Sequence, residues 1–575
     1  MSDKKKAFWF IALLSTLVII PFLGETIFYS KGEPREAIVA YSMLESGNWI
    51  LPLNYGTDIA YKPPFLYWSI AAISAIFGGV SEFSSRLPSA IAFLAMQFVF
   101  FGFVARYKNT KTAVITSLLL LTSFEVHRAA VACRLDMLQV SFIVISLCLL
   151  FRWDEKGCKG IPWTAVVLMA CGTLTKGPVG SIFPCMCIGI YQLIRGRSFG
   201  KTFLSLFGIG LLSLIPLGIW FYAAWLQGGQ PFMDLMLEEN TGRFVGKMSY
   251  PSHHNPLWYN FLTIIWGWIP WTLVLLISLF GLKWNEMHLL PAGNSFTGRI
   301  RKVWDNIRSQ SPIQLFIWIV TIAIFVFYCI PKSKRSVYLL PIYPFMAVLI
   351  AQYLEALMQK GAKVFKISAY IFASLCLLLT VVVFCCTLSD DTGQHMGQRT
   401  SCCRKHSVYA SFGKHVLFYF QMADYSIAGS GCHLYIKAGY QKKVSTGSLL
   451  YGIIGCVLCL FVALDGVYQP TILAVKSDKH LAEDIRKQVP EGVVYSYTDR
   501  MIRFYCTNYY MNNQMRNFTL ENPQEGYVIL SANAQEEFLK NYNAKYQLEE
   551  VFHTDYRSCD LRNTVIMYKF NEKRK

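Results

Sequence analysis

Long apolar runs alternate with short polar segments along roughly the first 470 residues of the chain. Runs that approach the length of about 20 residues needed to cross a bilayer predict transmembrane helices. We expect such helices at residues 7–24, 87–105, 112–125, 136–151, 162–176, 178–194, 202–226, 258–282, 312–330, 337–357, 364–387 and 449–467. A shorter run at 65–79 predicts an interfacial or partly inserted helix. The pattern therefore predicts an α-helical polytopic membrane protein with about 11–13 transmembrane helices.

From about residue 470 the pattern changes to that of a soluble domain. Charged residues replace the apolar runs, and a helical pattern at 532–541 stands among short β-like runs. These runs are Gly492–Tyr497, Tyr527–Ser531 and Thr564–Phe570. Alternating short strands and helices predict a small α/β module.

The same changes divide the chain into three parts. We expect a membrane-embedded domain at 1–387 with an external loop at 25–64, and an external loop with the last span or spans at 388–468. The soluble α/β domain occupies 469–575. A weakly hydrophobic stretch at 408–424 leaves open whether the chain crosses the membrane once more. This crossing decides the side on which the soluble domain lies. We place this domain outside, which requires that 408–424 spans the membrane.

Positive charge orients the helices. The polar segments assigned to the cytoplasm each carry at least two Lys or Arg. They are Arg106–Lys111, Arg152–Lys159, Arg195–Lys201, Lys283–Arg308 and Lys360–Lys366. Cytoplasmic loops of membrane proteins are enriched in these residues, so the agreement supports the alternation and puts the loop 25–64 outside.

Composition agrees with a membrane protein and argues against nucleic-acid binding. The 575 residues are 54% hydrophobic and only 15% charged, which is typical of integral membrane proteins. The formal net charge is +19, but no basic stripe with interleaved aromatic residues accompanies it. Much of the excess lies in short loops between apolar runs. We therefore expect membrane lipid, and no nucleic acid, among the partners.

The seventeen cysteines are scattered, and several lie inside apolar runs. They show no paired C-x-x-C spacing of the kind that binds zinc. We interpret most of them as small core residues and leave a disulfide near 386–432 open.

The loop between the first two apolar runs carries the first candidate chemistry. It opens with Glu33 and Arg35 on either side of Pro34, and it closes with Lys62-Pro63-Pro64. Between them, apolar positions in Ala37–Leu44 predict an amphipathic helix on the membrane surface. A loop of this length is uncommon unless it is functional.

The external segments, including this first loop, carry a set of charged residues. They contribute Lys31, Glu33, Arg35, Lys62, Glu125, Arg128, Arg134, Asp136, Lys176, Glu238, Glu239, Arg243, Lys247, Lys332, Lys334 and Arg335. Lys and Arg are usually enriched on the cytoplasmic side, so cations on the external side are unusual. Charges at the ends of spans are also costly unless they face a cavity or a partner. Taken singly, each is better explained by snorkelling or a structural ion pair. The set together indicates a bound anion, and Arg with Lys is typical of phosphate recognition.

The order of short motifs resembles that of the bacterial polyprenyl-phosphate-sugar glycosyltransferases. These motifs are GEPREAIVAYSMLESGNWILP, YKPPFLYW, RLPSA, RLDM, TKGP, ENTGRF, HHNPLWY and SKRSVYLLPIYP. The similarity covers roughly residues 1–360 and is greatest to the aminoarabinose transferases that modify lipid A, with protein O-mannosyltransferases more distant. It implies a membrane fold of the glycosyltransferase-C (GT-C) type, in which the first external loop carries the catalytic acid.

The resemblance also implies roles for individual residues. Glu33 and Arg35 correspond to the catalytic acid and its partner, with Gly32 where the family usually has Asp. The implied donor-phosphate ligands are Lys62, Arg243, Lys332, Lys334 and Arg335, and the implied pocket residues are Asp136, Lys176, Glu239 and Tyr338. Tyr61 and Asn240 stand where the family often has Glu and His, so we predict no bound structural zinc.

The function implied is single-displacement, inverting transfer of a sugar from a polyprenyl-phosphate donor. The acceptor would be an envelope lipid or glycan, such as lipid A, or a protein. The site would face the periplasm from the bacterial inner membrane. No cofactor is required by these residues, although a divalent cation completed by the donor phosphate is left open.

Two other classes were weighed against this one. A transporter or flippase for an anionic lipid would use the same cations without chemistry, but paired halves are typical of transporters and no internal repeat is evident. A structural or sensor membrane protein would leave the external cations unexplained.

Overall fold

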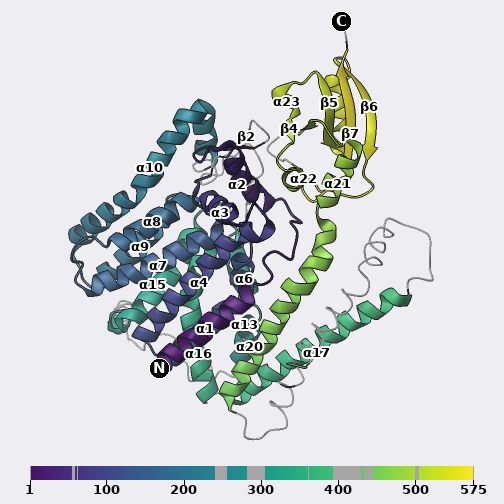
Figure 1. The fold of residues 1–575 in the computed structure, drawn as a ribbon. Helices are drawn as coiled ribbons and strands as arrows, with labels where there is room; N and C mark the ends of the chain where they lie inside the picture. Colours follow the sequence, from purple (N-terminus) through teal and green to yellow (C-terminus); the bar gives the residue numbers. More distant parts are fainter. Residues whose placement is uncertain are drawn as a thin grey trace.

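The computed structural model describes residues 2–54, 58–60, 62–239, 255–280, 305–360, 362–392, 445–498 and 504–573, with 429, 430 and 433. A bundle of helices makes up most of the molecule, and a small domain with a β-sheet lies at one end of it (Figure 1). The N-terminus lies at the opposite end of the molecule from the C-terminus (Figure 1).

The helices of the bundle follow the apolar runs of the sequence. They are α1 (Asp3–Ile19), α3 (Phe65–Ile76), α4 (Glu82–Tyr107), α5 (Thr110–Leu121), α6 (Phe124–Ala130), α7 (Leu135–Glu155), α8 (Trp163–Lys176), α9 (Val179–Ile194), α10 (Phe199–Leu237), α12 (Tyr259–Gly267), α13 (Trp271–Leu279), α15 (Pro312–Cys329), η3 (Ser336–Ile342), α16 (Tyr343–Lys360), α17 (Ala362–Thr392), α20 (Thr446–Ala463), η5 (Leu464–Leu473) and η6 (Ala474–Lys476).

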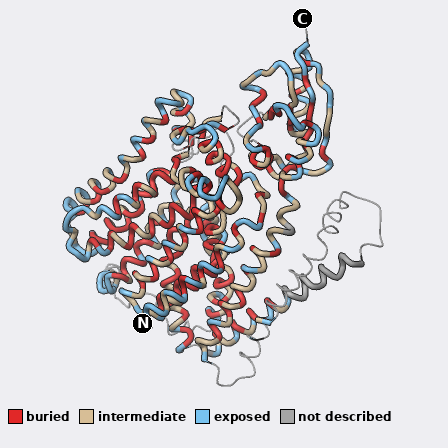
Figure 2. The backbone as a smooth tube through the Cα atoms, in the orientation of Figure 1, coloured by how far each residue is buried: buried red, intermediate tan, exposed pale blue. Residues whose placement is uncertain are grey.

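Several of these helices cross a membrane by length and composition. Among the described residues six are long and apolar enough, and the number rises to eight if each of two bent helix pairs is one span. Helix α7 lies in the middle of the bundle, and 78% of its most apolar stretch is buried. In α10 only 28% of the most apolar stretch is buried, and this helix exposes apolar side chains at the edge of the bundle (Figure 2). An exposed apolar face of this size fits contact with lipid. The chain is therefore a multi-pass membrane protein.

Two predicted spans are broken in the structure. The run 112–125 forms α5 and α6, which meet at 70°, and the run 258–282 forms α12 and α13, which meet at 108°. The two breaks contact each other, because the Phe124 N–H donates to the Ile269 carbonyl at 3.1 Å and the Trp271 indole donates to the Thr122 hydroxyl at 2.9 Å. Backbone groups freed inside a membrane need such partners, so tertiary contacts stabilise both breaks.

The first loop folds into helix α2 (Pro34–Ser46) and a short hairpin of β1 (Leu53–Asn54) with β2 (Asp58–Ile59). Pro34 occupies the first helical position, and Gly47 ends the helix with a φ of 69°, as favoured at the two ends of a helix. The apolar face that the sequence predicted for a membrane surface is buried by protein. Helix α2 packs between α3 and α22 (Tyr505–Tyr510), and these contacts bury Ala37, Ile38 and Ala40.

The C-terminal domain is a five-stranded sheet with helices, as the predicted α/β pattern required. Its order is β4-β3-β5-β7-β6, with β3 parallel to β4 and β5, and β7 antiparallel to β5 and β6. Its remaining elements are α21 (Lys479–Gln488), β3 (Val494–Ser496), β4 (Arg516–Asn517), α23 (Phe518–Glu521), β5 (Glu525–Ser531), η7 (Ala532–Ala534), α24 (Gln535–Tyr542), β6 (Tyr546–His553) and β7 (Val565–Glu572).

This domain is docked on the first loop. The hydroxyl of Tyr510 accepts the N–H of Phe28 at 2.8 Å and donates to the carboxylate of Glu82 at 2.7 Å, and Tyr509 donates to the Val80 carbonyl at 3.2 Å. The soluble domain and the first loop therefore lie on the same side of the helix bundle. The predicted span 408–424 and most of the predicted 386–432 disulfide region lie outside the described residues.

Candidate functional site

Glu33, the predicted catalytic acid, is buried at the start of α2 and is held by a different arginine from the one predicted. Its Oε1 accepts bonds from Arg86 Nε and from the Cys133 N–H, both at 2.9 Å, and its Oε2 accepts Arg86 Nη2 at 3.1 Å. Arg86 also donates to the carbonyl of Thr26 at 2.6 Å. The expectation that Arg35 partners Glu33 is therefore wrong.

The pKa of Glu33 reflects this environment. Burial alone would raise the pKa of the carboxyl group, but the charge and hydrogen bonds of Arg86 outweigh burial and lower the pKa below its ordinary value. Glu33 is accordingly an anion at neutral pH. A bidentate arginine–carboxylate pair fixes orientation as well as charge.

A second carboxylate, Glu36, pairs with Arg35, which the sequence assigned to Glu33, and with Lys62, which the sequence assigned to the donor phosphate. Its Oε1 accepts Arg35 Nη2 at 2.6 Å and Lys62 Nζ at 2.5 Å, and its Oε2 accepts the Tyr67 hydroxyl at 2.7 Å. Burial opposes ionisation, but Lys62 and Arg35 lower the pKa of Glu36 well below its ordinary value. No motif of the sequence singled out Glu36, although its place in the first turn of a helix was a signal, since carboxylates are favoured there.

Lys62 is a strongly perturbed cation of the site. Burial and the neighbouring charge of Arg35 lower the pKa of its ammonium to about 8, against the opposing influence of Glu36 and Glu239. Glu239, buried just after the end of α10, acts electrostatically on Lys62. The side chain of Lys62 is 20% exposed and that of Arg35 is 38% exposed, so both reach a solvent-accessible face.

A third cluster joins three predicted pocket residues. Lys176, at the end of α8, donates to Oδ1 of Asp136 in the first turn of α7 at 2.5 Å, and its ammonium lies 4.8 Å from the centre of the Tyr338 ring. Arg335 and Arg134 both act electrostatically on Asp136. The structure therefore brings together residues from α7, from α8 and from the start of η3.

Arg134 connects the Glu33 and Asp136 clusters; it belongs to the predicted set of external cations, but no motif gave it an individual role. It acts on both carboxylates. A Cβ added at Gly32 would meet Arg134 Nη2 at 2.5 Å, which is closer than real Cβ contacts come. The guanidinium of Arg134 therefore occupies the space that a side chain at position 32 would take, and such a side chain would displace it. The RLPSA and RLDM motifs, which contain Arg86 and Arg134, were the available signal.

The lysines of the PKSKR segment are placed differently from one another. Lys334 is buried, and its ammonium donates to the Pro331 carbonyl at 2.6 Å. Lys332 is exposed, and with Lys334 and Asn255 it lines a shallow hollow of about 370 Å³. No described contact joins either lysine to Lys62. Arg243, the other predicted phosphate ligand, lies outside the described residues.

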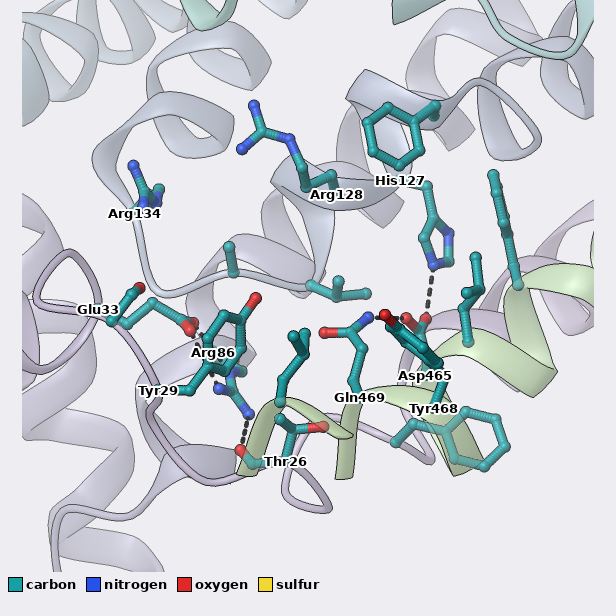
Figure 3. A pocket seen from close by; sticks show the side chains of 18 residues that line it. Thr26, Tyr29, Glu33, Arg86, His127, Arg128, Arg134, Asp465, Tyr468 and Gln469 are labelled. Carbon is teal, nitrogen blue, oxygen red and sulfur yellow. Dashed lines mark hydrogen bonds and ion pairs between the residues drawn. The ribbon is translucent and has the colours of Figure 1, made fainter. Parts of the chain in front are cut away.

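Glu33 also lines a cavity of about 320 Å³ between the first loop, α6 and the π-helical η5. Figure 3 shows Glu33, Arg86 and Tyr29 on one side of this cavity and the pair of His127 with Asp465 on the other. His127 Nε2 lies 2.6 Å from Asp465 Oδ2, and the imidazole stacks on Phe461. The ionised carboxylate of Glu33 can thus meet a group that enters from this cavity.

The chain is similar to enzymes that use lipid-linked sugars. Residues 61–220 match the model of the dolichyl-phosphate-mannose-protein mannosyltransferase family. An uncharacterized protein of Aquifex aeolicus (strain VF5) is 31% identical over 384 residues, or 65% of this chain and 78% of that one. The undecaprenyl phosphate-α-4-amino-4-deoxy-L-arabinose arabinosyl transferase of Shewanella sediminis (strain HAW-EB3) is 26% identical over 374 residues, or 64% of this chain and 63% of that one.

Solved structures show the same fold. The crystal structure of ArnT from Cupriavidus metallidurans bound to undecaprenyl phosphate superposes with a TM-score of 0.66 and 18% identity, and the match covers 98% of both chains. The apo crystal structure of the same protein gives the same values. This match includes the C-terminal domain, where the motifs of the sequence gave no clear resemblance.

Proposed function

Because this chain belongs to the GT-C membrane glycosyltransferases, in the group of the aminoarabinose transferases and protein mannosyltransferases, we propose that it transfers a sugar from a polyprenyl-phosphate donor to an envelope lipid or glycan. The name of the Shewanella relative and the lipid in the Cupriavidus structure support undecaprenyl phosphate as the carrier. No relative named in these comparisons is a transporter, and the flippase alternative has no observation in its favour.

One observation carries the proposal: charged residues from separate segments surround the first loop with an excess of positive charge. The cations are Arg35, Lys62, Arg86, Arg134, Lys176 and Arg335, and the carboxylates are Glu33, Glu36, Asp136 and Glu239. Six cations and four carboxylates leave a net charge of +2. Such an excess suits a phosphate group, and Arg and Lys are its usual ligands.

The leaving group determines the roles of Arg35 and Lys62. A sugar on a polyprenyl phosphate already has a good leaving group, so the enzyme needs to stabilise the charge that builds on the departing phosphate. The exposed faces of Arg35 and Lys62 can do this while Glu36 keeps both side chains in place. Glu36 is therefore a positioning residue in this scheme.

Glu33 faces the acceptor in this scheme. Its carboxylate is ionised and lines the 320 Å³ cavity. It can orient the attacking hydroxyl or accept its proton. Attack from this side on a donor held at Lys62 gives single displacement with inversion at the anomeric carbon.

The proposed site faces the periplasm from the bacterial inner membrane. The basic segments between spans orient the first loop outward, and the C-terminal domain docks on that loop. Lipid A is the first acceptor to test, because it is the substrate that the resemblance implies. In this scheme side-chain cations stabilise the phosphate and no cofactor is needed. A divalent cation held jointly by Glu36 and the phosphate is the alternative, and loss of transfer in a chelator would favour it.

Reconstitution in proteoliposomes tests the proposal. The enzyme is supplied with undecaprenyl phosphate carrying a radiolabelled sugar and with lipid A. Label on lipid A shows a transferase, whereas movement of intact donor across the bilayer without transfer refutes the proposal. Glu33→Gln is expected to lower turnover by at least about 100-fold, with the exposed Glu45→Gln as a matched control on the same helix. Mass spectrometry of lipid A from cells with and without the gene identifies the sugar.

A further inference from the structure

Four residues far from the proposed site meet inside the C-terminal domain. Asp478 precedes α21, Cys506 lies in the first turn of α22, and Cys559 and Asp560 lie between β6 and β7. A carboxylate oxygen of each aspartate and the Sγ of Cys559 all lie within 4.8 Å of one another. The thiol of Cys506 is within hydrogen-bonding reach of the Cys559 thiol.

The two aspartates are almost completely buried, with 1% of Asp478 and 2% of Asp560 exposed. Asp478 accepts bonds from the Cys559 N–H at 2.7 Å and from the Ser558 hydroxyl at 2.6 Å. Oδ2 of Asp560 accepts the Cys506 N–H at 2.8 Å. Oδ1 of Asp560 is buried and has no hydrogen-bond partner among the described residues.

Two buried carboxylates this close need a compensating positive charge or a proton. Within the described part of the chain neither aspartate forms an ion pair with a lysine or an arginine. Lys31 acts on Asp560 only by electrostatic attraction at a distance. A proton on Asp560 would leave a buried O–H group at Oδ1 without an acceptor, so protonation alone satisfies the cluster poorly.

We propose that Asp478, Asp560, Cys559 and Cys506 bind a divalent transition-metal ion of the Zn²⁺ class. The ion would satisfy the unpartnered Oδ1 and neutralise the carboxylates, and binding releases the thiol proton of each cysteine that coordinates. Thiolates with carboxylates favour zinc over magnesium or calcium. The ligand atoms of a tetrahedral zinc site lie roughly 3.3–3.8 Å apart. The ligand atoms of Asp478, Cys559 and Asp560, which lie within 4.8 Å of one another, would therefore move together by up to about 1–1.5 Å on binding.

The position of this cluster gives the metal a structural role. The thiol of Cys506 lies 3.3 Å from the Phe28 carbonyl, and the same carbonyl accepts the Ser477 hydroxyl. Phe28 begins the external loop that carries Glu33 and Glu36, and α22 packs on α2. A metal here would fix the part of the C-terminal domain that contacts the catalytic loop. This inference does not depend on the proposed transferase activity.

Metal analysis of the full-length protein in detergent tests the site. We expect about one Zn²⁺ per chain by elemental mass spectrometry, and at least about a tenfold loss of metal affinity in Asp560→Asn and Cys559→Ser. Glu491→Gln, an exposed carboxylate of the same domain, and Cys171→Ser, a thiol of α8, are matched controls that retain the metal. Thermal unfolding of the wild-type protein should shift to lower temperature when Zn²⁺ is removed.

A second measurement covers variants that do not fold. Co²⁺ added to metal-free wild-type protein should give thiolate-to-cobalt absorption bands that Zn²⁺ abolishes. Bands that persist unchanged in Cys559→Ser, or a wild-type protein that binds neither ion, would overturn the proposal. Thiol labelling of the denatured protein provides the remaining test, because a disulfide between Cys506 and Cys559 would also exclude the metal.

Discussion

Glu36→Gln tests whether the carboxylate that the sequence analysis overlooked controls the charge of Lys62. Glutamine keeps the shape of the side chain and an acceptor for the Tyr67 hydroxyl, but it removes the negative charge 2.5 Å from Lys62 Nζ. In the wild-type enzyme the pKa of Lys62 is about 8. In the proposed mechanism the cation binds the donor phosphate, so activity should fall as the pH rises through that value.

The size of the shift follows from the distance. Two unit charges at 2.5 Å interact by about 1.7 kcal/mol even at the dielectric constant of water, which is about 1.2 pKa units. The pair is partly shielded from water, so this is a lower limit. Loss of the Glu36 charge destabilises the ammonium form, and the sign is therefore downward. We expect the alkaline limb of kcat/KM to move from about pH 8 to about pH 7 or below.

The assay is the pH profile of sugar transfer in proteoliposomes. Lys62→Arg removes the titration, because arginine stays charged throughout this range, so its profile should lose the alkaline limb whatever its rate. Glu45→Gln, exposed on the same helix, should keep the wild-type profile. An alkaline limb that stays at the same pH in Glu36→Gln would refute the assignment of Lys62 and its control by Glu36.

Three further substitutions test the packing of the site. Arg86→Met leaves buried Glu33 without its cation and should lower the free energy of unfolding by about 3–5 kcal/mol, measured by chemical denaturation in detergent. Gly32→Ala should displace the Arg134 guanidinium, because the added Cβ lies 2.5 Å from Nη2, and should lower transfer activity with little loss of stability, since the end of a flexible side chain can shift. Lys176→Met should lower kcat/KM for the donor by about tenfold or more with a smaller change in stability.

Each of these variants has a matched control in the same bundle. Arg106→Met removes an arginine from the last turn of α4, and Lys201→Met removes an exposed lysine from α10. Gly200→Ala adds a Cβ where nothing lies within 4 Å. A stability of Arg86→Met equal to that of Arg106→Met, or an activity of Gly32→Ala equal to that of Gly200→Ala, would contradict the geometry described.

The sequence alone determined the kind of protein and the segments that carry the chemistry. Apolar runs located the membrane helices, because a helix in lipid satisfies its own backbone and must be apolar over its whole length. The charges left on the external side identified the first loop, Lys62, Asp136 and Lys176, since charges there are costly without a partner. The strands and the helix near 532–541 followed from local periodicity in the same way.

Tertiary structure decided which charges pair. Glu33 is two residues from Arg35, yet its partner is Arg86, which is 53 residues away. Several cations compete for each carboxylate, and the distances among them depend on how distant segments pack, which no local pattern encodes. The same holds for the broken helices, which rely on contacts between their breaks, and for the cluster of Asp478 and Cys559. Local periodicity sets what each segment can form, whereas contacts between segments set the position of every side chain that acts.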